Sequence, residues 1–415
     1  MVLEGYERAL LDSVAARGDA LVTRAIEWAE VSSGSRNLPG LERQLGLLEE
    51  AFSRLPGRIE RVPLAASQDV DAEGAAVVQE HPDALRVTVR PEAAVQVVLT
   101  GHYDTVYPEG TRFTGVSRRG DGALNGPGLA DMKGGLSVML GALEAFESHP
   151  DAGSLGYRVL LSPDEEIGSP ASAAHLADLA QSAQVGLTYE PALGDGALAS
   201  SRKGSGNFAV AVSGRSAHAG RDFASGRNAV AAAARLAVAL DGLNGARAGV
   251  TLNVARVDGG GPLNMVPAAA VLRFNVRVED AVSAAWVEQA IDEQIAACGR
   301  EGVSFRRHGG MTRAPKPVNA AQRRLFGEVR RLAGLIGMDL QWKPSGGVCE
   351  GNNLFAAGLP NLDTLGVRGG DIHSFDEHAW PDSFVERAQL SALILSRLAS
   401  GAIDARGLRA AMGED

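Results

Sequence analysis

The stretch YRVLLSPDEEIGSP, Tyr157 to Pro170, joins an apolar run to two adjacent glutamates, Glu165 and Glu166. A short apolar run that ends at turn residues is typical of a buried strand. An Ala-rich segment at 170–182 and a second β-type run, VGLTYEP, follow it. This alternation of strand, helix and strand predicts an α/β layer architecture with a mixed, mostly parallel sheet.

The rest of the chain predicts a second, smaller domain inside the first. Helical periodicity near 5–31 and 38–54 and the β-type runs ALRVTVR and VQVVLTGH belong to the α/β part. From 204 to 314 the order becomes βαββαβ, which predicts a ferredoxin-like α+β unit. The first pattern resumes after the Pro-rich TRAPKPVN. We therefore expect one domain from residues 1–203 and 315–415, interrupted by an inserted domain at 204–314.

Composition and charge exclude several classes of protein. The 415 residues carry a net charge of -10. Nucleic acids and anionic membranes favour clustered Lys and Arg, so we expect neither as a partner. The N-terminal segment is charged from its start, unlike a signal peptide, and no run reaches the roughly 20 apolar residues of a membrane span. These features predict a soluble cytoplasmic protein, provided that Met1 is the natural start.

Several polar residues that follow β-type runs have an ordinary interpretation when each is taken alone. Adjacent glutamates in a loop are most often solvated surface, and a histidine two residues from a carboxylate, as in His102 and Asp104, is a weak signal. Asp131 precedes the helical segment that begins at DMKGG, where a helix-capping Asp would look the same. Glu190 ends VGLTYE, and His373 lies in the turn RGGDIHS.

The joint pattern indicates more than its parts. Open α/β sheets place their sites at the carboxyl ends of their strands, where most of these residues are expected. Imidazole nitrogens and carboxylate oxygens are the ligands of two-metal hydrolytic sites. A pair of cations would also remove the repulsion between Glu165 and Glu166. The sequence therefore predicts a two-metal site.

The same segments carry a resemblance to a known family. In chain order they read GHYDTVYP, NGPGLADMKGG, SPDEEIGS, YEP, SGRSAHAG, NMVPAAAVLRFNVR and GGDIHS. This set resembles the co-catalytic zinc metallopeptidases and deacylases, which include glutamate carboxypeptidases, aminoacylases, acetylornithine deacetylase and succinyl-diaminopimelate desuccinylase. The resemblance covers nearly the whole chain and is closest to the glutamate carboxypeptidase branch.

The resemblance implies a role for each residue of the predicted site. It implies two zinc ions, for which cobalt or manganese could substitute, with His102 and Glu190 on one, His373 and Glu166 on the other, and Asp131 on both. Glu165 would be the general base, and Asp104 would orient His102. In some relatives a cis peptide follows the bridging Asp, which here is the bond between Asp131 and Met132.

Three residues of the inserted domain gain roles from the resemblance. His218 could be an ordinary loop histidine, but its counterpart in relatives reaches the partner subunit's site and donates to the developing oxyanion. Arg277 could lie on a solvated strand face, but its counterpart binds the substrate's α-carboxylate. Asn264 matches a further polar contact to the substrate. We therefore expect a homodimer formed through 204–314, which also serves as a lid.

One segment departs from the family pattern. Where many relatives read Gly-Ser-Asp-Gly, this chain has GGVCEGNN, with Cys349 and Glu350 in the Ser and Asp places. A catalytic thiol is not expected, because the metals make a covalent route superfluous. The resulting hypothesis is a dizinc hydrolase that cleaves an amide bond next to a free carboxylate, as a glutamate-type carboxypeptidase does. The alternatives are an N-acyl amino acid or N-acetyl diamino acid deacylase and a non-catalytic ligand-binding relative.

Overall fold

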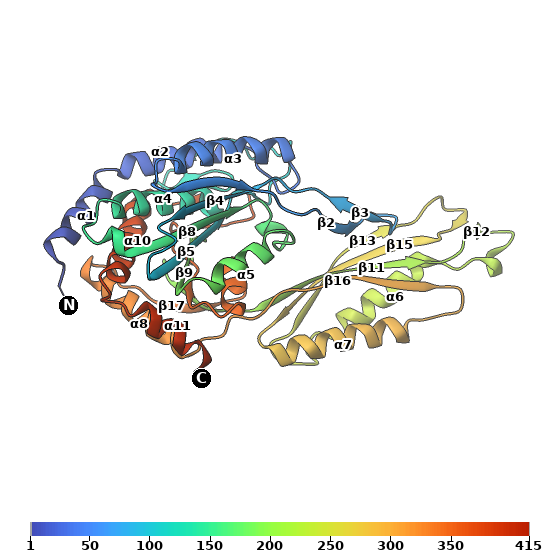
Figure 1. Cartoon of the computed structure of the whole chain (residues 1–415). Helices are drawn as coiled ribbons and strands as arrows, with labels where there is room; N and C mark the ends of the chain where they lie inside the picture. Colours follow the sequence, from blue (N-terminus) through green and yellow to red (C-terminus); the bar gives the residue numbers. More distant parts are fainter. Residues whose placement is uncertain (1, 415) are drawn as a thin grey trace.

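The molecule has a larger and a smaller body, and the larger of its two main sheets lies inside the larger body (Figure 1). The structure, a computed structural model, describes residues 2–414. The six strands of this sheet, in spatial order, are β1 (Arg58–Val62), β4 (Ala84–Val89), β8 (Leu155–Ser162), β5 (Val95–His102), β9 (Val185–Thr188) and β18 (Asn361–Leu362). Strand β5 runs parallel to β8 and β9, and β18 runs parallel to β9, whereas β4 is antiparallel to β1 and β8. The predicted α/β class with a mixed, mostly parallel sheet is confirmed.

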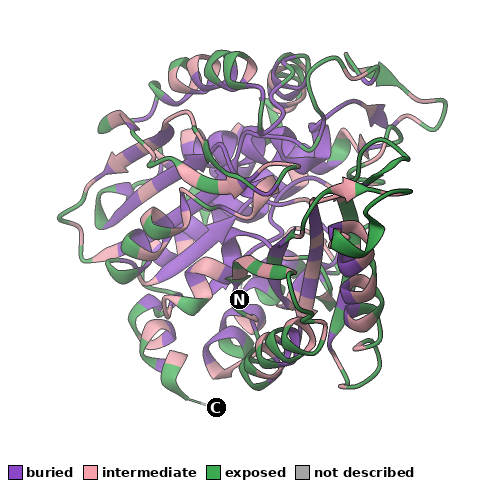
Figure 2. Cartoon of the chain, turned by 90° about the vertical axis from the view of Figure 1, so that its right-hand side faces the viewer, coloured by how far each residue is buried: buried purple, intermediate pink, exposed green. Residues whose placement is uncertain are grey.

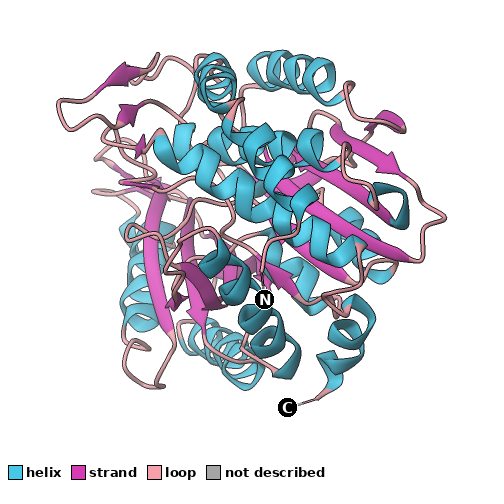
Figure 3. Cartoon of the chain, turned by 90° about the vertical axis from the view of Figure 1, so that its left-hand side faces the viewer, coloured by secondary structure: helices cyan, strands magenta, loops and turns pink. Residues whose placement is uncertain are grey.

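Helices cover both faces of this sheet, and its central strands are buried (Figures 2 and 3). Alternate residues of β5 face opposite layers, since Val97 and Leu99 belong to one apolar cluster and Val98 to another. The first cluster includes residues from α1 (Gly5–Ala15), α2 (Gly18–Ala29), α3 (Leu38–Phe52), α4 (Gly134–Phe146), α8 (Ala320–Leu335) and α10 (Asp382–Ala399). The second includes residues from α5 (Ala173–Gln181) and α9 (Glu350–Ala356). The period-2 apolar pattern of β5 thus builds a three-layer core.

The helical pattern expected near 5–31 forms two helices, α1 and α2. They are separated at Arg17, whose backbone is not helical. A Cβ atom at Gly18 would lie 2.8 Å from Val385 of α10, so glycine permits this close approach. The C-terminus adds one further short helix, α11 (Ala405–Ala410). Among residues 2–414, no helix combines the length and apolar composition that crossing a membrane requires.

The second main sheet belongs to a ferredoxin-like unit. Its spatial order is β13 (Thr251–Gly259), β15 (Ala269–Val278), β11 (Gly204–Ser213) and β16 (Ser304–Arg313), and all neighbours are antiparallel. Helices α6 (Ala229–Asp241) and α7 (Ala281–Ala297) complete the predicted βαββαβ order and share an apolar cluster with the sheet. The exact domain limits, 204 and 314, stay a prediction.

A hairpin that the sequence did not reveal lies on this second sheet. It consists of β2 (Ser67–Val70) and β3 (Ala76–Gln79), and Figure 1 shows it reaching from the larger body to the smaller one. An added Cβ at Gly74 would lie 3.0 Å from Ala211, so the turn contacts β11. The Nη2 group of Arg273 donates to the carbonyl oxygens of Val70 and Asp71.

The two chain segments that connect the bodies lie side by side. Arg202, in β10 (Leu198–Arg202), and Lys316 exchange backbone hydrogen bonds of 3.0 and 2.9 Å. Both side chains also contact one buried carboxylate oxygen of Asp363, at 2.8 and 2.7 Å. Strand β17 (Trp342–Ser345) pairs with β10 beside them. The two connecting segments are therefore joined to each other by backbone hydrogen bonds and to the larger body by the ion pairs with Asp363.

A small sheet brings two distant loops together near the end of β5. Its spatial order is β19 (Gly369–Gly370), β20 (His378–Ala379), β7 (Leu124–Asn125) and β6 (Ser117–Arg118). The loop between β19 and β20 carries His373, and the segment after β7 leads to Asp131. Pairing of β20 with β7 therefore places these two residues near each other.

Candidate active site

A cleft of about 710 Å³ lies between the two bodies. The larger body lines it with Asp131, Glu165, Glu166, Glu190 and His373, among others, and the strands of the smaller body line it with Ser205, Asn207, Asn275, Arg277, Thr312 and Arg313. One wall is thus rich in carboxylates and the other contains two guanidinium groups. Apolar side chains, including those of Leu193, Val348 and Ile372, also line the cleft.

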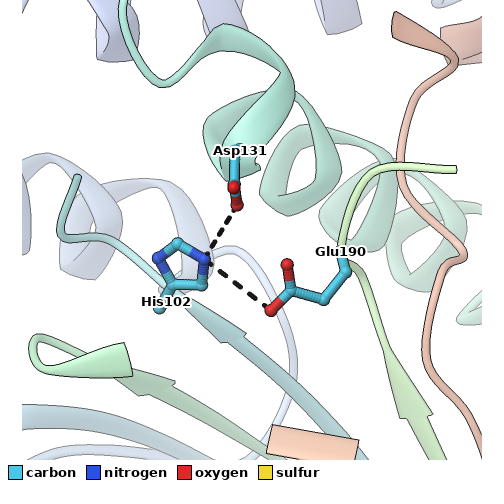
Figure 4. Close-up of side chains that lie close together, drawn as sticks. All are labelled: His102, Asp131 and Glu190. Carbon is cyan, nitrogen blue, oxygen red and sulfur yellow. Dashed lines mark hydrogen bonds and ion pairs between the residues drawn. The ribbon is translucent and has the colours of Figure 1, made fainter. Parts of the chain in front are cut away.

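His102 is the last residue of β5 and is fully buried. Its Nδ1 atom lies 3.1 Å from the carbonyl oxygen of Asp104 and 3.3 Å from the carboxylate oxygen Oδ1 of the same residue. These acceptors favour the tautomer with the proton on Nδ1, which leaves a lone pair on Nε2. The Nε2 atom lies 3.1 Å from Oδ1 of Asp131 and 3.7 Å from Oε1 of Glu190 (Figure 4).

His373 forms a second convergence of the same kind. Its Nε2 atom lies 3.3 Å from Oδ2 of Asp131 and 3.3 Å from Oε2 of Glu166. The two carboxylate oxygens of Asp131 therefore face two different histidines. Each histidine, in turn, shares Asp131 with one glutamate, so the structure brings together all five residues predicted as metal ligands.

The turn that carries Asp131 is held by a residue that the sequence did not reveal. Asp131 lies in the turn Leu129–Lys133, where the backbone of Asp131 and Met132 is not helical, and the peptide bond between these two residues is cis, as expected. The carboxylate of Glu377 accepts the backbone N–H groups of Gly128, Ala130 and Asp131 at 3.0–3.1 Å. No local pattern around Glu377 signals this role, because its partners lie almost 250 residues earlier in the chain.

Asp104 has two roles in the structure, of which the sequence indicated one. Besides contacting His102, its carboxylate accepts the backbone N–H groups of Glu165 and Glu166, each at 3.2 Å. The hydroxyl of Ser35 donates to it at 2.7 Å. One buried carboxylate thus fixes both the first histidine and the loop that carries the two glutamates.

The donor sets fit two divalent cations that share Asp131. Within each group, His102 with Asp131 and Glu190 or His373 with Asp131 and Glu166, the ligand atoms lie within 4.8 Å of one another. Burial raises the pKa of Glu190 to about 7 and raises that of Glu166 well above its usual value. Their Oε1 atoms have no hydrogen-bond partner among the described residues. A cation would satisfy these oxygens and the histidine lone pairs, and such ligands suit zinc, cobalt or manganese.

Glu165 belongs to neither donor set, although it lines the same cleft. Its Oε1 atom forms an ion pair of 2.6 Å with Nη1 of Arg313. Arg277 also lines the cleft, and its Nη1 atom is buried without a hydrogen-bond partner among the described residues. Burial, with Arg313 as a nearby positive charge, lowers the pKa of Arg277. The wall formed by the smaller body therefore contains a buried guanidinium nitrogen without a hydrogen-bond partner among the described residues.

His218 and Asn264 lie away from this cleft in the single chain. His218 belongs to the two-residue strand β12 (Ala217–His218), which pairs with β14 (Met265–Val266) at the end of the smaller body farthest from the larger sheet (Figure 1). Both residues are exposed. The backbone N–H groups of Gly220 and Arg221 donate to Nδ1 of His218, which leaves Nε2 as a donor facing outward. The predicted roles of both residues stay predictions.

The segment GGVCEGNN, which differs from the family pattern, contributes buried side chains behind the cleft. Cys349 is the N-cap residue directly before α9, and its Sγ atom accepts the backbone N–H of Gly351. Burial raises the pKa of the Cys349 thiol well above its usual value, which keeps the thiol protonated and a poor nucleophile. The carboxyl of Glu350 is hydrogen-bonded to the hydroxyl of Ser162, at the end of β8. Burial raises the pKa of Glu350 to about 8.

The chain is similar in sequence and in fold to several known proteins. A family model described as peptidase family M20/M25/M40 matches residues 98–397. Carboxypeptidase G2 of Pseudomonas sp. is 26% identical over 330 residues, which cover 75% of this chain and 76% of that protein. Succinyl-diaminopimelate desuccinylase of Acinetobacter baylyi is 27% identical over 67% of this chain and 76% of its own length. Among solved structures, the dipeptidase Dug1p of Saccharomyces cerevisiae, 14% identical, superposes with a TM-score of 0.74 over 95% of this chain and 98% of that chain.

Proposed function

This chain belongs to peptidase family M20/M25/M40, and from that membership we propose that it is a dizinc hydrolase that cleaves an amide bond next to a free carboxylate. In its more specific form, the proposal is a glutamate-type carboxypeptidase that acts on an N-acyl or peptidyl substrate. One observation carries it: the two carboxylate oxygens of Asp131 face His102 and His373 separately, each beside one further glutamate.

The ligand roles follow from this arrangement. His102 and Glu190 would hold one ion, His373 and Glu166 the other, and Asp131 both. Bound there, two divalent ions supply Lewis acidity, which polarises the scissile carbonyl and makes water easier to deprotonate. Asp104 supports the first site by fixing the ring of His102 through Nδ1.

Glu165 is the residue best placed to move the proton. It lines the cleft but lies in neither donor set, so neither proposed ion would occupy its carboxylate. In the proposed reaction it accepts a proton from the attacking water and later passes it to the nitrogen of the leaving amine. A positioned acid–base group of this kind typically contributes about 10²–10⁴-fold to rate.

Arg277 is proposed to bind the substrate's free carboxylate. Its guanidinium lines the wall opposite the metal ligands, and its buried Nη1 lacks a partner among the described residues. A guanidinium pairs with a carboxylate through two parallel hydrogen bonds. Binding there would place the adjacent amide bond in the cleft between Arg277 and the ligands.

The Arg277→Ala protein is expected to lose most of its preference for substrates with a free α-carboxylate. Loss of a charge-assisted bidentate pair should lower kcat/KM for an N-acyl glutamate by roughly tenfold to a hundredfold, since such bonds contribute about 1.5–3 kcal/mol. The corresponding α-carboxamide, which cannot form this pair, should change much less. Steady-state kinetics on the two substrates measure the difference.

Arg273 provides a matched control for this experiment. It lies four residues earlier on the same strand, but its guanidinium contacts the hairpin β2–β3 and does not line the cleft. Arg273→Ala should therefore leave the ratio between acid and carboxamide unchanged. Equal losses for both substrates in Arg277→Ala would show that Arg277 does not bind the carboxylate.

Two alternatives remain distinct from this proposal. Similarity to a succinyl-diaminopimelate desuccinylase favours an N-acyl amino acid or N-acetyl diamino acid deacylase as the second candidate. Assays of folate-like acylglutamates against acetylated amino acids, with and without chelator and added zinc, separate the two. A non-catalytic relative would have lost a metal ligand or Glu165, yet all six residues are in place.

The homodimer is proposed to form through the smaller body. Edge strand β13 and helix α6 expose large apolar side chains there, including Val257 and Val238, and the fully exposed Leu263 lies next to Asn264. Association through this surface would cover side chains that water otherwise solvates. It would also allow His218 to act in the other subunit's cleft. The cytoplasmic location stays a prediction.

A further inference from the structure

Arg313 makes three contacts with the loop that carries the proposed base. Its Nη1 atom lies 2.6 Å from Oε1 of Glu165. Its Nη2 atom donates to the carbonyl oxygen of Glu165 at 3.2 Å and to the hydroxyl of Ser169 at 2.7 Å. Only 3% of its side chain is exposed. Such a buried, multiply bonded guanidinium has little freedom to move independently of the loop.

These contacts join the two bodies of the molecule, because Arg313 and Glu165 belong to different bodies. Arg313 is the last residue of β16, the strand from which the chain returns to the larger body. Glu165 belongs to the larger body, in the short loop after β8. The contact therefore joins the smaller body directly to the proposed base, close to where Arg202 and Lys316 pair.

Glu165 is held by two groups, Asp104 and Arg313, of which only Arg313 contacts its carboxylate. Asp104 accepts the backbone N–H of Glu165 but does not contact its carboxylate. Arg313 is the cation that pairs with this carboxylate among residues 2–414. Without Arg313, the side chain could rotate, and the loop would keep its backbone contacts to Asp104 but lose those to Arg313.

We propose that Arg313 is a positioning residue that orients the Glu165 carboxylate toward the reacting water. The inference rests on the proposed role of Glu165 as base. Both terminal guanidinium nitrogens of Arg313 contact the loop and only its Nε lacks a partner, whereas the terminal Nη1 of Arg277 has no hydrogen-bond partner among residues 2–414. Arg277 is thus the substrate-binding guanidinium, and Arg313 acts through Glu165.

The main test compares the kinetics of Arg313→Met with those of the wild-type dimetal enzyme on an N-acyl glutamate. Misplacing a catalytic group by about 1 Å can cost on the order of a hundredfold in rate, so we expect kcat to fall by roughly tenfold to a hundredfold. KM should change by less than about twofold, because substrate binding does not use Arg313. Arg313→Lys, which keeps the charge but has one nitrogen, should recover part of the loss.

A second readout does not depend on activity. In the metal-free protein, backbone amides of residues 164–169 should exchange with deuterium faster in Arg313→Met than in wild type, because the loop has lost three contacts. Ser169→Ala is the matched variant: it removes the contact to Ser169 but keeps the ion pair with Glu165. Its kcat should fall by less than about threefold, since the base stays oriented.

Three results would overturn the proposal: an unchanged kcat, an unchanged amide exchange of residues 164–169, or a rise in KM limited to substrates with a free carboxylate. The last would make Arg313 a substrate ligand. If Arg313→Met fails to fold, Arg313→Lys carries the test, and a wild-type kcat in that variant is the contrary result. An active Glu165→Ala protein would instead remove the base itself, so failure of the proposed function can be told apart from failure of this inference.

Discussion

The Glu165→Ala protein is expected to bind two metal ions per chain and to turn substrate over at least about a hundredfold more slowly than wild type. The reason is geometric. Glu165 lines the cleft but lies outside both groups of ligand atoms, and its backbone is held by Asp104 rather than by its own side chain. Removing the carboxylate should therefore leave the ligands in place while the reaction loses its base. Metal analysis and steady-state kinetics on the same preparation measure both properties.

The neighbouring Glu166 supplies the matched comparison. Its Oε2 atom faces His373, so Glu166→Ala should lower metal content as well as turnover. Substitution of two adjacent glutamates would then have different effects: the change at Glu165 would lower only the rate, and the change at Glu166 would also lower metal binding. A Glu165→Ala protein with near wild-type turnover would remove Glu165 as the base, and one that loses metal would make it a ligand.

The second large effect is expected for His218→Ala. If His218 completes the oxyanion site of a partner subunit, the variant should fold, bind both metals and lose roughly two to three orders of magnitude in turnover, as when one such donor is removed. In the single chain His218 is exposed and does not line the cleft. Because His218 lies far from the cleft of its own chain, a large loss of turnover would indicate that it acts in the cleft of a second copy of the chain. His308→Ala, at a partly exposed histidine on β16, should keep its activity.

Mixing two inactive proteins tests the exchange of His218 between subunits. In a heterodimer of His218→Ala and Glu165→Ala, one of the two clefts would contain an intact base and receive an intact histidine. Activity should therefore return after subunit exchange, which co-purification of differently tagged chains can demonstrate. If exchange occurs and no activity returns, His218 serves its own subunit or none.

Much of the proposed metal site could be predicted because its residues lie at the ends of recognisable β-runs. His102 ends β5, and Glu190 follows β9 by two residues. A buried strand has a strong sequence signal, and polar residues directly after it stand out against that background. The βαββαβ unit was predictable for the same reason, since its long strands and helices alternate clearly.

The supporting contacts could not be predicted, because they join residues that are far apart in sequence. Glu377 holds the turn of Asp131, and Arg313 holds the loop of Glu165 from the end of β16. The local sequence around each of these residues does not differ from that around an exposed charged residue. The hairpin β2–β3 was missed because its strands have four residues each and many polar positions, and its packing partner is the distant second sheet.

The most direct test of the two-metal account is a zinc titration of metal-free protein. Chelator should abolish hydrolysis of an N-acyl glutamate, because in the proposed mechanism the ions held by His102, His373 and the three carboxylates activate the water. Activity should then return as zinc is added and reach its plateau at two zinc ions per chain, since Asp131 is shared by two donor sets. Full activity in protein shown by metal analysis to contain no metal would contradict the account.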